Sequence, residues 1–274
     1  ISKTPVKQNV EPFYKKTKLV EEKLNAIIKN GVSASMLGLY AMDQIKFFET
    51  YVLGLKEEII EETIASSTIG NIVHDSLELI YKDYVGKRLK MGDFKKMKGK
   101  INTIVQSIIR NYVREENIYK GKNIIIVETV KEYVKKVIEL DQKTIEKGNR
   151  LKIIAVEREF ENEIKDKEKK FKIRGKIDRI DELNGEVRVI DYKSGKKLRQ
   201  RNITIKHSEE LTKEKGIYNL QLLVYMLGIK EEFNEKTIKS GIINLKNISE
   251  GVLEGVFNGK TVLNNNEMEN YKNK

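Results

Sequence analysis

Cysteine is absent from this 274-residue sequence, and proline occurs only twice. The lack of cysteine excludes structural disulfides, thiolate zinc sites and cysteine-held iron–sulfur clusters. Both prolines, Pro5 and Pro12, lie close to the start of the chain. No Pro/Gly/Ser-rich linker interrupts the rest, so we expect one domain behind a loosely ordered start.

Long apolar runs are also missing. None approaches the roughly 20 residues that span a bilayer, and the opening ISKTPVKQNV has no apolar signal-peptide core. We therefore expect an intracellular, cytoplasmic protein without a membrane partner. The first residue is Ile instead of Met, which suggests a trimmed chain or a piece of a longer polypeptide.

Positive charge is in excess. Lys and Arg number 53 against 41 Asp and Glu, which gives a net charge of +12 and a pI near 9.4. Such an excess is the electrostatic footprint of a nucleic-acid partner. It can equally reflect the Lys-, Ile- and Asn-rich composition of an AT-rich genome, so charge supports a nucleic-acid function without establishing one.

Helical periodicity dominates the first half of the chain. Residues 33–55 predict a helix capped by Ser33 or Ser35, and residues 66–85 predict a second helix. Residues 86–148 alternate Lys and Glu with Ile, Val and Tyr at helical spacing. They predict a basic helical insertion that offers no chemistry of its own.

The period changes to two from Leu151 onward. The strand-like segments are IIAVEREFENEI, KFKIRGKIDRID, EVRVIDYKSG, KSGIINLKNI and GVLEGVFNG, and one helical segment, GIYNLQLLVYMLGI, interrupts them. This order predicts an α/β (α+β) core with a mixed central sheet flanked by helices. We expect an N-terminal extension at 1–32, a single domain at 33–258 and a C-terminal tail at 259–274.

The segment VRVIDYKSGK begins as an apolar strand and then carries two charged residues, Asp191 and Lys193, two positions apart. The preceding Asn184-Gly185 suits a two-residue type I′ hairpin turn, because both central positions of that turn need φ > 0. Lys193 projects from the same face as Asp191, since side chains alternate along a strand.

The hairpin turn predicts the pairing of the two strands. It places Asp181 opposite Arg188, which is favourable, and Asp178 opposite Asp191. Opposed carboxylates repel each other, and a shared proton or a divalent cation such as Mg²⁺ would offset the repulsion. The alternative is that both acids lie on a solvated face and that Lys193 merely neutralises them.

Four short strings, in the order GNIVHDSLELIY, GKIDRID, VIDYKSGK and QLLVY, resemble motifs of the PD-(D/E)XK nuclease superfamily, specifically its RecB/AddB-like exonuclease branch. The resemblance spans residues 33–257, because SASMLGLYAMDQIKFFETYVLGL is similar to the helix that precedes the histidine motif there. It implies a restriction-endonuclease-like core and makes residues 33–258 a nuclease domain.

The resemblance also implies a metal site. His74, Asp178 and Asp191 match the residues that bind Mg²⁺ or Mn²⁺ in the family, together with the main-chain carbonyl of Tyr192. Lys193 matches the motif lysine, which orients the attacking water and stabilises charge on the phosphate. These groups suit phosphodiester hydrolysis, because a cation supplies Lewis acidity and a water of lowered pKa.

Gly70 and His74 fall on one stripe of the helix predicted at 66–85. Gly70 could let this helix approach the hairpin closely, and His74 could then reach the cation. The alternative is a packed or exposed histidine, because a lone histidine is more often one of these than a ligand.

Two further pairs are candidates for the site. Gln221 and Tyr225 match the family's Q-x-x-x-Y element, which contacts the site or the nucleic-acid backbone, although spacing alone gives only a core-edge pair. Glu157 and Glu159 could add an outer carboxylate beside the ligands. For both glutamates an exposed position on a surface strand is the favoured interpretation.

The chain departs from many relatives in one respect, because these bind an iron–sulfur cluster through cysteines, one of them near the position of Met42. No cysteine is present here, so no cluster is expected. The insertion at 86–148 is a second place where substrate choice could differ.

The leading hypothesis is a Mg²⁺-dependent deoxyribonuclease, an exonuclease or end-processing module of DNA repair or recombination. It would act on single-stranded or duplex DNA ends, beside a helicase subunit or a helicase-like region of a longer chain, in association with the nucleoid. The alternatives are a non-catalytic DNA-binding or scaffold module with the same fold, and a structure-specific endonuclease with the same site.

Overall fold

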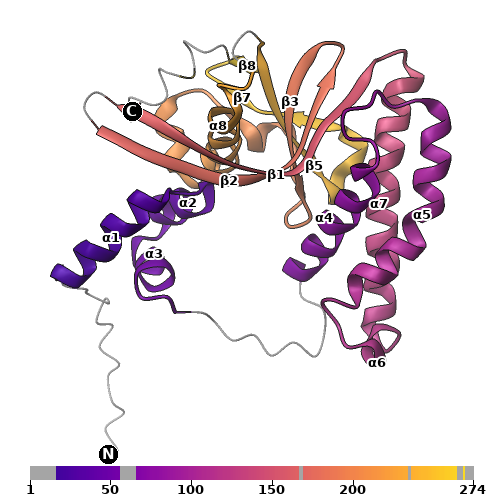
Figure 1. The fold of residues 1–274 in the computed structure, drawn as a ribbon, viewed down its shortest axis with the longest axis horizontal. Helices are drawn as coiled ribbons and strands as arrows, with labels where there is room; N and C mark the ends of the chain where they lie inside the picture. The colour runs from indigo at the N-terminus through magenta and orange to yellow at the C-terminus, as the bar shows by residue number, and fades with distance from the viewer. Residues whose placement is uncertain (1–16, 56–65, 167–168, 234–235, 264–267, 269–274) are drawn as a thin grey trace, which may run out of the picture.

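Helices cover both faces of a mixed β-sheet in this protein (Figure 1). The structure is a computed structural model that describes residues 17–55, 66–166, 169–233, 236–263 and 268. Helices α2 and α8 lie on one side of the sheet, and α4, α5 and α7 lie on the other (Figure 1). The predicted α/β class is confirmed.

The central sheet has the strand order β1-β2-β3-β5-β6, and β8 pairs with β5. Its strands are β1 (Leu151–Asp166), β2 (Lys169–Leu183), β3 (Glu186–Lys193), β5 (Ile238–Asn244), β6 (Val252–Glu254) and β8 (Val262–Leu263). The β3–β5 pair is parallel and the other pairs are antiparallel, so the sheet is mixed. A separate small sheet pairs β4 (Thr204–Ile205) with β7 (Val256–Phe257).

The helices after residue 65 agree with the periodicity of the sequence, whereas the helix at 18–30 was not predicted. They are α1 (Lys18–Asn30), α2 (Ala34–Met42), α3 (Gln44–Phe47), α4 (Ser66–Lys82), α5 (Met91–Ile109), α6 (Glu115–Ile118), α7 (Lys122–Glu146) and α8 (Ile217–Ile229). A π-helix, η1 (Phe48–Val52), continues α3, and short 3₁₀ turns include η5 (Leu245–Glu250) after β5. The helices predicted within residues 86–148 are confirmed as α5, α6 and α7.

The helix predicted over residues 33–55 is divided at Asp43. Ser33 caps α2 by accepting a hydrogen bond from Met36 N at 3.2 Å, as one of the two predicted caps. Asp43 has extended backbone angles, and its carboxylate accepts from Lys46 N at 2.9 Å, so it ends α2 and begins α3. The prediction of one continuous helix is wrong because this side chain competes for backbone donors.

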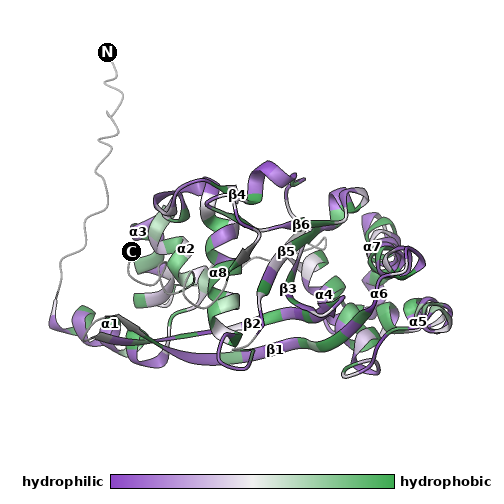
Figure 2. Ribbon diagram, turned by 90° about the horizontal axis from the view of Figure 1, so that it is seen from above, coloured by the Kyte–Doolittle hydropathy of each residue, from purple (hydrophilic) through white to green (hydrophobic). Residues whose placement is uncertain are grey.

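Each face of β3 packs against a different hydrophobic core. Val187 and Val189 belong to the core under α8, whereas Ile190 and Tyr192 belong to the core under α4, α5 and α7. Figure 2 shows hydrophobic colour along α8, which contacts β3. A strand covered on both faces is apolar on both faces, so an acid within it needs a specific partner.

The hairpin turn forms at Asn184-Gly185, where φ is 54° and 98°. Asp181 pairs with Arg188 in the predicted register. This part of the prediction is confirmed, because the left-handed backbone of a two-residue turn determines the register next to it.

The predicted pairing of Asp178 with Asp191 is wrong, because the β2–β3 ladder ends at the pair Arg179–Ile190. Beyond that pair, β2 continues along β1 and β3 continues along β5, so the two strands diverge. The amide of Tyr192 donates to Asp178 Oδ2 at 2.7 Å. The Asp178 carboxylate therefore takes the place of a backbone carbonyl as the acceptor for the Tyr192 amide.

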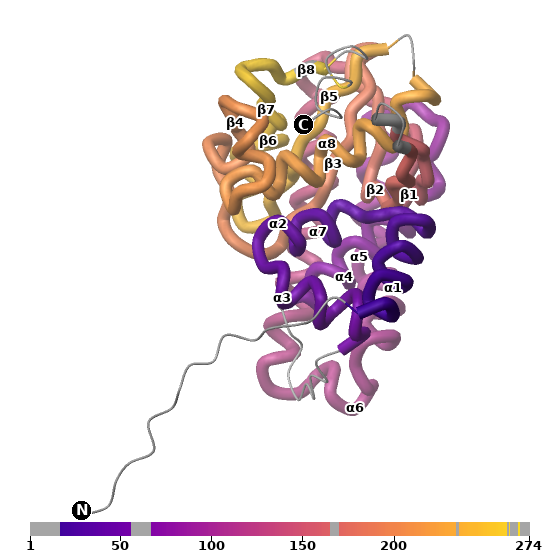
Figure 3. Tube along the Cα trace, turned by 90° about the vertical axis from the view of Figure 1, so that its left-hand side faces the viewer, coloured from indigo at the N-terminus to yellow at the C-terminus, as the bar shows by residue number. Residues whose placement is uncertain are grey.

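Segments outside the expected nuclease domain also contribute to the structure. Within the range 1–32, α1 lies beside the β1–β2 ribbon (Figure 3), and Val32 forms a bridge with Ile173 of β2. Within the range 259–274, Leu263 of β8 pairs with Ile238 of β5. Among the described helices, none has the length and hydropathy needed to cross a membrane.

Candidate metal centre

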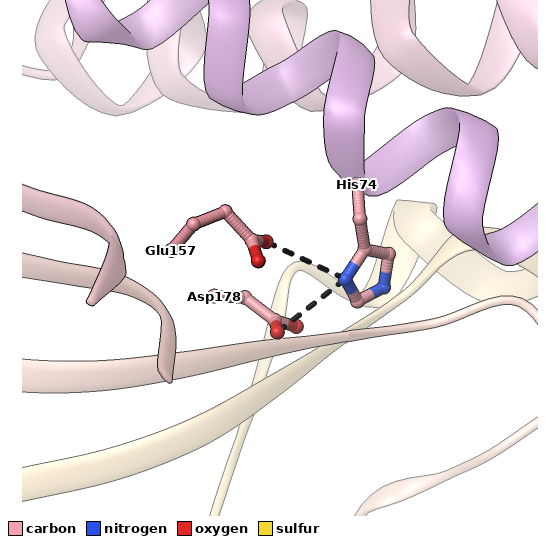
Figure 4. A group of neighbouring side chains, drawn as sticks. All are labelled: His74, Glu157 and Asp178. Atoms are coloured by element: carbon pink, nitrogen blue, oxygen red, sulfur yellow. Dashed lines mark ion pairs between the residues drawn. The ribbon is translucent and has the colours of Figure 1, made fainter. Parts of the chain in front are cut away.

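His74, Glu157 and Asp178 converge from three different elements, α4, β1 and β2 (Figure 4). His74 Nδ1 lies 3.3 Å from Asp178 Oδ1 and 3.7 Å from Glu157 Oε1. One potential ligand atom from each residue lies within 4.8 Å of the others. The exposed fractions of the two carboxylate side chains are only 8% and 7%. A group of one imidazole and two carboxylates suits a divalent cation.

The backbone of Glu157 explains why its carboxylate points inward. Glu157 lies on β1 between the residues that pair with Ile177 and Arg179, so it is level with Asp178. Its φ is +47°, a value that is uncommon for a residue other than glycine. The favoured surface-strand position is therefore wrong for Glu157, whose carboxylate faces His74 and forms an ion pair with Lys176.

Asp191 and Lys193 form a buried ion pair at the end of β3. Lys193 Nζ lies 2.9 Å from Asp191 Oδ2 and 3.1 Å from Oδ1, and Asp191 has an exposed fraction of 2%. Burial raises the pKa of Asp191 to about 6; Lys193 opposes the rise and the negative charge of Asp178 adds to it. Burial alone would lower the pKa of Lys193, but the Asp191 carboxylate raises it, so Lys193 is an ammonium.

His74 carries a positive charge among these acids. A carbonyl oxygen only accepts, so His74 Nε2 donates to Tyr192 O at 3.0 Å. Burial disfavours the charged imidazole, but the hydrogen bonds to Asp178 and Glu157 outweigh it and raise the pKa of His74 to about 10. A metal would bind His74 only after this proton leaves.

Gly70 lies where α4 comes close to Ser194, the residue after β3. A Cβ atom at this position would lie 2.8 Å from Ser194 Oγ, closer than side-chain carbons normally come. The expectation that Gly70 permits a close approach is confirmed. One turn further along α4, His74 reaches the carboxylates.

Helix α8 brings Gln221 and Tyr225 to the other side of the site. Gln221 Nε2 donates to the hydroxyl of Tyr225 at 2.7 Å. Burial and the nearby charges of Asp191 and Asp178 raise the pKa of Tyr225, so its phenol is neutral. Gln221 also lines a cleft of about 400 Å³ together with Lys193.

Glu159 is placed differently from Glu157. It is exposed, pairs with Lys176 across the β1–β2 ladder, and lines a surface cleft that also includes Arg174. It lies outside the described group of His74, Glu157 and Asp178.

A buried charge network supports the site from the α4–α7 side. Arg179, with an exposed fraction of 1%, lies 2.7 Å from both Asp141 and Asp181. Tyr81 donates to Asp141 at 2.5 Å, and Arg188 contacts Asp181 at 2.7 Å and 3.0 Å. The network thus joins α4, α7, β2 and β3 immediately beside Asp178.

Only the Asp181–Arg188 pair of this network was predicted from the sequence. A signal for Asp141 was present, because it falls on the stripe of α7 that carries Val134, Val137 and Ile138. An acid within an apolar stripe indicates a buried partner.

A sequence model of the PD-(D/E)XK nuclease superfamily matches residues 31–273, which is most of the chain. A search of curated proteins found no match. The family match agrees with the resemblance of the four motif strings and with the mixed sheet.

Proposed function

The chain belongs to the PD-(D/E)XK nuclease superfamily, and from this premise we propose that it is a Mg²⁺- or Mn²⁺-dependent deoxyribonuclease of the RecB/AddB-like branch. The superfamily supports a metal-dependent nuclease that hydrolyses phosphodiester bonds. The observation that carries the proposal is the group of His74, Glu157 and Asp178 beside the buried Asp191–Lys193 pair.

The donors present fit a hard divalent cation. Asp178, Asp191 and the carbonyl of Tyr192 would hold it, with His74 once deprotonated and with Glu157 as an additional carboxylate. Asp191 Oδ2 is buried and makes no well-directed hydrogen bond within the described part of the chain, so it has capacity for a ligand. When bound, the cation supplies Lewis acidity and a water of lowered pKa.

Lys193 and the α8 pair would act on the substrate. The ammonium of Lys193, held by Asp191, would orient the attacking water and stabilise negative charge on the phosphate. Tyr225 accepts a hydrogen bond from Gln221, and its own hydroxyl proton has no acceptor among the residues that the structure describes, so this proton would be donated to the nucleic-acid backbone.

The direct test is a titration of Mg²⁺ or Mn²⁺ into the protein with labelled single-stranded and duplex DNA. Asp191→Ala and Lys193→Ala should each abolish cleavage, because one removes a ligand and the other removes the charge beside the phosphate. Glu159→Gln on the exposed side of β1 is the matched control and should cleave like the wild type. Cleavage that survives both site substitutions overturns the proposal.

The finer proposal is an exonuclease or end-processing module of DNA repair or recombination, associated with the nucleoid inside the cell. An exonuclease needs an end, so covalently closed circular DNA should resist it while the linearised form is degraded; cutting of the circle supports an endonuclease instead. RNA of the same sequence tests the preference for DNA.

Partnership with a helicase or a helicase-like region predicts that duplex ends are degraded much faster when a helicase and ATP supply single strands. Metal-independent DNA binding without turnover in any of these assays supports the non-catalytic alternative.

A further inference from the structure

We propose that a lysine-lined cleft between α7 and the 3₁₀ turn η5 binds the phosphate backbone of the nucleic acid whose cleavage site lies at Lys193. The cleft has a volume of about 570 Å³. The lysines that line it are Lys136, Lys143, Lys147, Lys197 and Lys246. This inference rests on the proposed nuclease function and adds to it a contact away from the reacting phosphate.

One wall of the cleft is a stripe of lysines on α7. Lys136 and Lys143 lie on α7, and Lys147 is the residue that ends it; they are seven and four residues apart, close to two turns and one turn, so they share one side of the helix. At 1.5 Å per residue the stripe is about 16 Å long. A strand of duplex DNA carries one phosphate per 3.4 Å of axis, so the stripe spans several phosphates.

Two of these lysines have no acidic partner within the part of the chain that the structure describes. Lys136 lies 3.7 Å from Glu132, but Lys143 and Lys147 form no ion pair with any residue that the structure describes. Of the lining residues, Glu139 and Glu250 are the acids, against five lysines. The lining is therefore positive overall and complements a polyanion.

The opposite wall is fixed by buried amides. Asn244 at the end of β5 is fully buried, and its Nδ2 donates to the carbonyls of Lys193 at 3.2 Å and Lys196 at 2.9 Å. Its Oδ1 accepts from Leu198 N at 3.2 Å. The loop between these contacts carries Lys197, so Lys197 is held in place at the cleft.

The same contacts connect the cleft to the catalytic edge of the sheet. β3 and β5 are parallel, and Lys193 pairs with Asn244, so the loops that follow both strands leave the same edge. In α/β sheets ligands bind outside the carboxyl ends of parallel strands. Lys246 follows β5 directly, and a backbone that passes Lys193 can therefore continue past Lys197 and Lys246.

A structural role for the α7 lysines makes a different prediction. Lys143 and Lys147 lie at the carboxyl end of α7, where positive charge stabilises the helix dipole. If that were their whole role, reversing their charge would lower the thermal stability without changing the salt dependence of DNA binding.

The test is Lys143→Glu combined with Lys147→Glu, with binding of duplex and single-stranded oligonucleotides measured in EDTA over a salt series. Each phosphate contact contributes about 0.9 to the slope of log K against log salt for duplex and about 0.7 for single strands. The double variant should therefore lower the slope by about 1.8 and about 1.4, respectively, and weaken binding at low salt at least tenfold.

The matched control is Lys95→Glu combined with Lys120→Glu, exposed lysines outside the cleft lining that give the same change in net charge. It should keep most of the wild-type slope. If α7 fails to fold in the first variant, Lys197→Glu with Lys246→Glu tests the cleft from the opposite wall. A slope equal to that of the control in a folded cleft variant overturns the inference, as does a drop in melting temperature alone.

The two proposals fail separately. Binding in EDTA does not require metal, so a wild-type protein that binds DNA through the cleft but never cleaves it removes the proposed function and leaves the cleft. If instead the protein cleaves DNA but the cleft variants leave its DNA affinity unchanged, the proposed function stands and the cleft proposal is overturned.

Discussion

The buried position of Arg179 makes Asp141→Ala the most informative stability variant. Asp141 accepts hydrogen bonds from Arg179 at 2.7 Å and 3.2 Å and from Tyr81 at 2.5 Å. Removing the carboxylate leaves Arg179 buried with Asp181 as its remaining acidic partner. Breaking one side of a buried ion pair costs about 3 to 5 kcal/mol, because the remaining charge stays out of water.

Equilibrium unfolding in urea, followed by far-UV circular dichroism, measures this cost. Asp83→Ala is the control, because Asp83 also lies 2.7 Å from its partner, Lys100, but the exposed fractions of the two side chains are 60% and 49%. The control should leave the urea midpoint almost unchanged, since solvent screens an exposed pair. The two variants thus compare two ion pairs with the same 2.7 Å separation, one buried and one exposed.

A third variant tests whether the cost comes from the stranded charge. Arg179→Met together with Asp141→Leu removes both members of the pair and replaces them with apolar side chains, while the buried Asp181 keeps Arg188 as its partner. It should recover part of the stability lost in Asp141→Ala, because buried pairs tolerate joint replacement, although Asp181 loses one of its two arginine partners. Equal, small losses for Asp141→Ala and Asp83→Ala would refute the reasoning.

Three further predictions concern the site and its support. Gly70→Ala should reduce the rate of cleavage, because the new Cβ would lie 2.8 Å from Ser194 Oγ. Adding Ser194→Gly should restore much of the rate, and a double variant as slow as Gly70→Ala alone would show that this contact is not the cause. Glu157→Gln should weaken Mn²⁺ binding, measured by calorimetry, whereas Glu159→Gln should not, because only the Glu157 carboxylate faces His74. Equal Mn²⁺ affinities of the two variants would contradict this prediction. Burial alone would raise the pKa of Asp181, but its two arginine partners lower this pKa below the usual 3.8. The Asp181 carboxylate therefore makes its full contribution to the stability of the fold above about pH 4 and loses it in acid. The difference in unfolding free energy between the wild type and Asp181→Asn should therefore shrink as the pH falls below about 4, and a difference that grows with acid would contradict the sign.

The sequence could predict what local geometry determines. The turn at Asn184-Gly185 sets the register beside it, so Asp181 was correctly placed opposite Arg188. Extending the same register to Asp178 failed, because the divergence of the strands depends on the pairing of β2 with β1 and of β3 with β5. Those partners lie elsewhere in the chain, and a hairpin alone contains no information about them.

Glu157 shows why burial at the site was harder to predict. Its neighbours in the sequence alternate as a surface strand does, and the inward turn of its carboxylate depends on a positive φ. The charge it faces belongs to His74, on a helix separated from β1 by the whole insertion. Asp141 is similar, because its place in an apolar stripe predicts a buried partner, but Arg179 is 38 residues away.

These contacts change how the insertion at 86–148 is interpreted. Two opposite sides of α7 make different contacts: Asp141 binds Arg179 beside the candidate metal centre, whereas Lys143 and Lys147 line the cleft. A chain with a short loop in place of the insertion would lose a partner of a buried arginine and one wall of the proposed binding surface. Asp141→Ala should therefore change stability and the charge-reversal variant should change DNA affinity, because the two sides of one helix act on different properties of the protein.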